Sequence, residues 1–135
     1  MAKVLRASSL VTFGLLIMIA APVFAHHGNA AMDTSKRITV TGTITEWVWA
    51  NPHCWLKMDV TDDKGNVVHW VMEENAPSTL VGFGFTRQSF KPGDKATVTM
   101  IVAKNGQPAG RPNKIVVNGK TYSVYEGGAQ DSQDQ

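Results

Sequence analysis

Hydrophobic and polar residues alternate along several stretches of the chain, and this pattern predicts β-strands. Between residues 37 and 49, Ile38, Val40 and Ile44 alternate with threonines, and a period of two places the two kinds on opposite faces of a strand. Similar runs follow, with turn residues between them at 62–66 and 118–119. The expected strands cover residues 37–49, 53–61, 67–73, 95–103, 114–117 and 122–125.

The period changes once, between the third and fourth expected strands. Residues 76–84 have Pro77 near their start and glycines at their end, which predicts a short helix. Three strands, a helix and further strands are the order of an OB-type barrel. We therefore predict a mostly β fold, a small OB-like Greek-key barrel of five to six strands with one short helix between strands 3 and 4. A plain sandwich is the alternative, and Gly42 in the first strand favours the barrel because it indicates a bulge or tight bend.

The first 25 residues have the pattern of a signal peptide. Lys3 and Arg6 precede an uncharged apolar run at residues 10–21, about a dozen residues long, whereas a spanning helix needs roughly 20. Val23-Phe24-Ala25 is a small-x-small cleavage pattern. We expect cleavage after Ala25, a periplasmic or secreted protein, and no stable membrane insertion after cleavage. An uncleaved membrane anchor is the alternative.

Cleavage changes the charge of the chain. Two of the 13 basic residues leave with the signal peptide, so 11 basic and 11 acidic residues remain. A net charge near zero without a basic run argues against nucleic acid as a partner. The lone Cys54 cannot form an internal disulfide. We expect a signal peptide (1–25), an irregular amino-terminal arm (26–36), one OB-like β domain (37–126) and a disordered tail (127–135).

Several motifs along the chain resemble one family of exported bacterial proteins. They are Ala25-His26-His27-Gly28, Thr41-Gly42-Thr43-Ile44, Trp49-Ala50-Asn51-Pro52-His53, Trp70-Val71-Met72-Glu73 and Lys91-Pro92-Gly93-Asp94. The likeness is to domain of unknown function 6152 and covers nearly the whole mature chain. The resemblance implies export and an OB-like β fold, and it implies no settled activity.

The histidines after the cleavage site predict a metal site. With cleavage after Ala25, the α-amine and ring Nδ1 of His26 can chelate one ion, and His53 is the expected third ligand, in the manner of a histidine brace. Three nitrogens suit Cu(II). In a second arrangement, the amine of His26 binds with the amide and ring of His27. Both arrangements require a deprotonated amine, so we expect affinity to fall in acid.

Cys54 and the tryptophans have two interpretations each. Cys54 is a candidate soft ligand beside His53, or a small buried hydrophobe that alternates with Leu56. Trp49, Trp55 and Trp70 are candidates for a ligand-binding face, or they fill the core. The leading hypothesis is a metal-binding protein, with copper favoured. The alternative is a non-catalytic OB-type module that binds a small ligand, glycan or protein.

Enzymatic activity is the less favoured interpretation. The sequence has no nucleophile motif, phosphate loop or dinucleotide fingerprint. Glu73 and Glu74 are adjacent, so in a strand they point to opposite faces and cannot act as a paired acid and base. An oxidative copper enzyme is the third hypothesis, by local analogy with the histidine brace alone.

Overall fold

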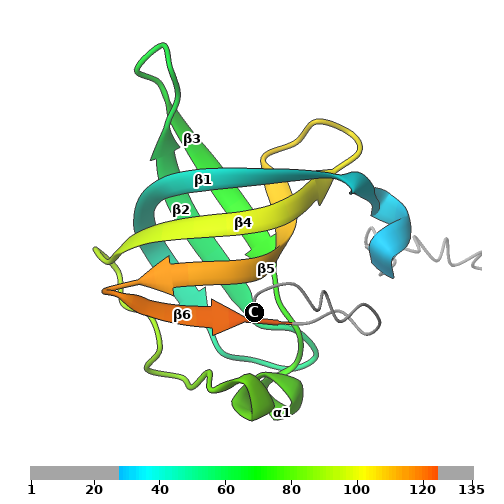
Figure 1. Ribbon diagram of the computed structural model, residues 1–135, viewed down its shortest axis with the longest axis vertical. Helices are drawn as coiled ribbons and strands as arrows, with labels where there is room; N and C mark the ends of the chain where they lie inside the picture. Colours follow the sequence, from blue (N-terminus) through cyan, green and yellow to red (C-terminus); the bar gives the residue numbers. More distant parts are fainter. Residues whose placement is uncertain (1–27, 125–135) are drawn as a thin grey trace, which may run out of the picture.

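A computed structural model describes residues 28–124 of the protein, and its strands curl into a barrel (Figure 1). The expected signal peptide, His26, His27 and the expected tail lie outside the described residues. Within residues 28–124, no helix has the length and apolar character needed to cross a membrane.

The observed elements follow the predicted order of three strands, a helix and further strands. Pro77 occupies the first turn of α1, where its missing N–H costs no hydrogen bond. The elements of the described residues are η1 (Gly28–Ala31), β1 (Met32–Val48), β2 (Trp55–Thr61), β3 (Val67–Glu73), α1 (Pro77–Leu80), η2 (Val81–Phe83), β4 (Lys95–Ala103), β5 (Ala109–Val117) and β6 (Lys120–Ser123).

The strands form one sheet that closes on itself. Their order is β3-β2-β1-β4-β5-β6, and β3 also pairs with β5 in parallel, with Val71 opposite Ala109 and Met72 opposite Gly110. This extra pairing joins β1 to β5 into a ring, while β6 extends the sheet beyond β5. The predicted OB-like barrel, with one short helix between the third and fourth strands, is therefore confirmed.

Gly42 lies where β1 passes from β4 to β2. A Cβ atom at this position would collide with the backbone oxygen of Asp59 and lie 2.9 Å from Cγ2 of Val60. The pairing of β1 with β2 also shifts register between Ile44 and Glu46. Glycine thus permits the close crossing of two strands. β1 continues unbroken through Gly42, and the irregularity expected at Gly42 lies further along, between Ile44 and Glu46.

The barrel interior is filled by alternate residues of the strands. One mouth, near α1, is closed by a cluster of aromatic rings, in which Phe85 lies 4.9 Å from Tyr122 and Trp47 lies 4.9 Å from Phe90, centroid to centroid. Such contacts add to the free energy gained by burying the rings. The fully buried core residues include Cys54, Leu56, Met58, Met72, Leu80, Val98 and Met100.

Several strand boundaries were predicted wrongly. The prediction of an irregular arm over residues 26–36 is wrong from Met32 onward, because β1 begins at Met32, which pairs with Ala103. A register shift between Asp33 and Arg37 hides the alternation of hydrophobic and polar residues there. Likewise β5 begins at Ala109, five residues before the predicted start. Gly110 fits there because a Cβ atom would lie 2.6 Å from the Ile101 oxygen. The observed β2 is shorter than predicted, and β6 (Lys120–Ser123) begins and ends two residues earlier than predicted.

Candidate functional site

His53 lies just before β2, and its ring is held against the end of β3. Nδ1 lies 3.1 Å from the Glu74 carbonyl oxygen and 3.1 Å from Oε1 of Glu73. Backbone hydrogen bonds between the β2 and β3 segments continue beyond the start of β2 and the end of β3. The backbone N–H of Cys54 donates to Asn75 (3.2 Å), and the N–H of Glu74 donates to Cys54 (2.9 Å). The backbone on both sides of the ring is therefore fixed.

The surroundings of Nδ1 determine the tautomer of neutral His53. Both the Glu73 carboxylate and the Glu74 carbonyl are acceptors, so the ring proton lies on Nδ1 and the lone pair lies on Nε2. Metal-binding histidines commonly donate their other N–H to a carboxylate or a backbone carbonyl in this way. Neutral His53 with its proton on Nδ1 thus has the tautomer that a ligand binding through Nε2 requires.

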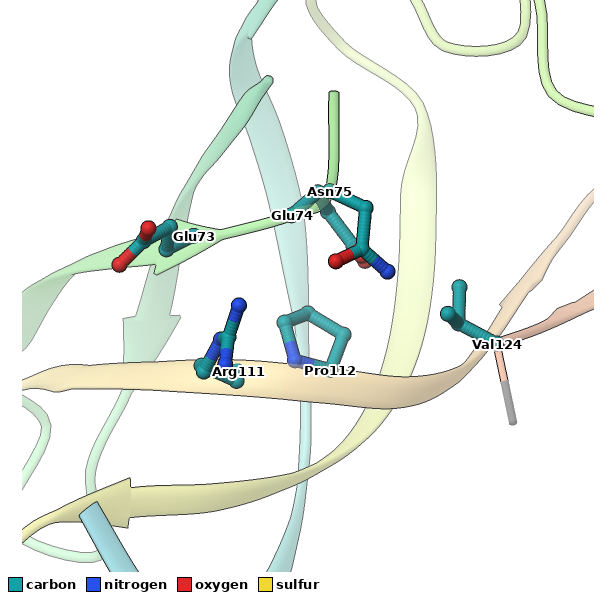
Figure 2. Close-up of a pocket in the computed structure, with 6 residues that line it drawn as sticks. All are labelled: Glu73, Glu74, Asn75, Arg111, Pro112 and Val124. Atoms are coloured by element: carbon teal, nitrogen blue, oxygen red, sulfur yellow. The ribbon is translucent and has the colours of Figure 1, made fainter. Parts of the chain in front are cut away.

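A small pocket lies between the end of β3 and the start of β5, and its lining includes Glu73 and Glu74, which contact His53. Figure 2 shows the Arg111 side chain rising from β5 toward Glu73 and Glu74. The Glu74 side chain is buried, with 2% exposure. The free volume of about 10 Å³ holds no more than one water-sized particle. The pocket lining consists of Glu73, Glu74, Asn75, Arg111, Pro112 and Val124.

Cys54 faces the barrel interior. It is fully buried, and its Sγ lies 3.9 Å from the Ala50 carbonyl oxygen. Burial raises the pKa of the Cys54 thiol, and the charge of Glu74 adds to this rise. A raised pKa leaves the thiol protonated at neutral pH, and thus a poor metal ligand. This place in the core favours the interpretation of Cys54 as a small buried hydrophobe.

The described residues do not by themselves supply a metal centre. Within residues 28–124, no three or more His, Cys, Asp or Glu side chains lie together in a group that could hold a metal ion. His69 is exposed and pairs with Asp59, with Nδ1 and Oδ1 2.6 Å apart. A metal site of three such ligands that includes His53 would need a further ligand from outside these residues.

The three tryptophans of the expected ligand face are divided between the two sides of the strand layer. Trp49 and Trp70 pack against the core, and Trp49 lies 5.8 Å from the ring of Trp47. Trp55 alternates with the buried Leu56, so it lies on the outward face of β2. The structure therefore does not bring the three rings onto one face.

Glu73 and Arg111 were missed as site residues in the sequence. The two adjacent glutamates were considered only as an acid–base pair, whereas the Glu73 side chain and the Glu74 carbonyl both contact His53. The hairpin turn between β2 and β3 could have predicted this contact. It pairs Thr61 with Val67, and the resulting register places Trp55, close to His53, opposite Glu73. Arg111 reaches this place only through the pairing of β3 with β5.

The fold and the site together define a small OB-like barrel protein with a histidine fixed at the end of its β2–β3 ladder. The chain matches the model of the Family of unknown function (DUF6152) over residues 14–113, and it belongs to this family. The predicted family membership is thus confirmed. A search of curated proteins found no match.

Proposed function

We propose that the protein is exported and binds a metal ion, with Cu(II) favoured, at the amino terminus that cleavage after Ala25 creates. The α-amine and ring Nδ1 of His26 are two ligands, and Nε2 of His53 is the third. The observation that carries the proposal is the fixed ring of His53, whose Nδ1 faces Glu73 and the Glu74 carbonyl. The proposed role is sequestration, delivery or sensing of the metal.

The contacts of the described arm support a shared site. The N–H of Lys104 donates to the Ala31 carbonyl oxygen (3.0 Å), and its Nζ donates to that of Ala30 (3.0 Å). The loop that follows Lys104 ends at Pro108, whose carbonyl oxygen accepts from the N–H of Val71 (3.0 Å), two residues before Glu73. The β4–β5 loop therefore contacts both the arm and the end of β3. η1 covers Gly28–Ala31, so only the two residues before it can be extended, and His26 reaches at most roughly 7 Å from Gly28.

A second arrangement of ligands uses the arm alone. The amine of His26, the deprotonated amide of His27 and the His27 ring can form a tridentate set on Cu(II) without the barrel. It would make the arm a flexible scavenger. The two arrangements differ in which histidine they need, because only the first includes His53.

Titration of the mature protein with Cu(II) against a chromophoric chelator separates the two arrangements. In the shared site, we expect His53→Ala to weaken binding at least about tenfold, since even the partners of metal ligands contribute 10- to 100-fold. His27→Ala then has little effect. If the arm binds alone, we expect His27→Ala to weaken binding and His53→Ala to have little effect. His69→Ala is the matched control and should bind as the native protein does. Native affinity in both the His53→Ala and the His27→Ala proteins would rule out the two arrangements.

A further inference from the structure

The barrel has a second pocket, which shares no lining residue with the pocket between Glu73 and Arg111. It lies among the first half of β1, the middle of β3, the end of β4 and the β4–β5 loop, which is the yellow loop that follows β4 in Figure 1. Its volume is about 270 Å³, close to the lower end of the range for small-molecule sites. The pocket lining consists of Asp33, Lys36, Ile38, Trp70, Val102, Ala103, Lys104, Gly106 and Gln107.

The apolar part of this pocket is a continuation of the core. Ile38, Trp70 and Val102 come from three different strands and pack against the core, yet each is only partly buried. At the mouth near α1, by contrast, Phe85 and Phe90 are buried, with 1% and 3% exposure. A concave apolar surface that stays open to solvent, with an indole ring in it, is typical of a ligand site.

The polar part of the pocket is positively charged. The Oδ1 of Asp33 accepts from the N–H and the hydroxyl of Ser35 (3.1 and 2.6 Å), and these bonds, together with the nearby charges of Lys36 and Lys104, lower the pKa of Asp33. Lys104 donates to a neutral carbonyl. Within residues 28–124, neither Lys36 nor Lys104 forms an ion pair with a carboxylate. Two ammonium groups and one carboxylate leave a net positive charge beside an apolar floor.

We propose that this pocket binds a small aromatic carboxylate. Its ring stacks on Trp70 between Ile38 and Val102, and its carboxylate pairs with Lys36 and Lys104. The volume of about 270 Å³ lies near the lower end of the range for small-molecule sites, which suits a small single-ring acid. A neutral sugar fits less well, because its hydroxyl groups would be buried against the apolar floor without partners. The proposal does not depend on the metal site.

The test uses the full mature chain, with benzoate and the uncharged benzamide, which has nearly the same shape, as probes. NMR follows the four tryptophan indole N–H signals, and a Trp70→Phe protein assigns the signal of Trp70. We expect benzoate to shift the Trp70 signal with a dissociation constant in the millimolar range, about what nine heavy atoms can give. Benzamide should bind at least about threefold more weakly. No shift of the Trp70 signal up to about 20 mM benzoate would overturn the proposal.

Three variants test how the ligand is held. Lys36→Gln and Lys104→Gln should each weaken benzoate binding about three- to tenfold and leave benzamide binding unchanged. Lys64→Gln, in the exposed β2–β3 turn, is the control and should bind both probes as the native protein does. Equal affinity of benzoate and benzamide, or loss of benzoate binding in the Lys64→Gln protein, would contradict a carboxylate held by Lys36 and Lys104.

Discussion

Blocking the amine of His26 is expected to weaken Cu(II) binding about a hundredfold or more. A mature chain extended by one pyroglutamate residue has no amine at its start, so the five-atom connection between amine and ring can no longer close on the ion. Linking two binding groups can raise affinity 10²- to 10⁴-fold over either group alone, and a hundredfold loss corresponds to about 2.7 kcal/mol. Competition titration with a chromophoric chelator measures the difference.

The pyroglutamate extension also has a built-in control. Residue 26 precedes the barrel strands, so the extension should not change the urea midpoint of unfolding, and any loss of affinity then reflects the ligand and not the fold. Copper binding as tight as that of the native chain would mean that the amine is not a ligand. Both proposed arrangements would then be wrong, because each contains that amine.

Gly42→Ala is expected to lower the free energy of unfolding by about 3 kcal/mol. The added methyl group would meet the backbone oxygen of Asp59 and lie 2.9 Å from the Val60 side chain. Backbone atoms of a paired strand cannot rotate away as a side chain can, so the two strands must separate, and overpacking of this kind costs about 1–3 kcal/mol or more. Urea denaturation followed by tryptophan fluorescence measures the loss.

The matched control for Gly42→Ala is Gly82→Ala. Gly82 is exposed in η2, and a Cβ atom there has no neighbour within 4 Å. We expect this variant to remain within about 0.5 kcal/mol of the native protein. If Gly42→Ala were as stable as Gly82→Ala, the close crossing of β1 and β2 would not be the reason for a glycine at position 42.

Much of the fold could be predicted from the sequence because the local signals agree with it. Alternation gave β3 and β4 their correct bounds, and the turn at residues 118–119 placed the last hairpin. Pro77 marked the start of the helix. These signals depend on neighbouring residues along the chain, so they can be read without knowledge of the tertiary structure.

The parts that were missed depend on contacts between distant segments. Gly110 and Pro112 are typical of a loop, yet both lie in β5, where Gly110 gives room for the backbone of Ile101. Strand β1 starts early because β4 pairs with it across a register shift. No local pattern encodes such pairings.

In the candidate site, too, local sequence signals could be read in advance, and contacts between distant segments could not. His53 could be named from its place after a turn, and nothing along the chain near it revealed that Glu73 and the Glu74 carbonyl would fix its ring. Adjacency in the sequence suggested Cys54 as a metal ligand beside His53. Adjacent residues of an extended chain point to opposite sides, and Cys54 is in the core.

The central claim is that cleavage creates a copper ligand at His26, and native mass spectrometry of the protein purified from its own cells tests this claim most directly. The spectrum gives the first residue of the chain and any bound metal in one measurement. We predict a chain that begins at His26 and carries one copper ion after exposure to Cu(II). A chain that begins elsewhere, or a chain that begins at His26 and retains no copper, would contradict the account.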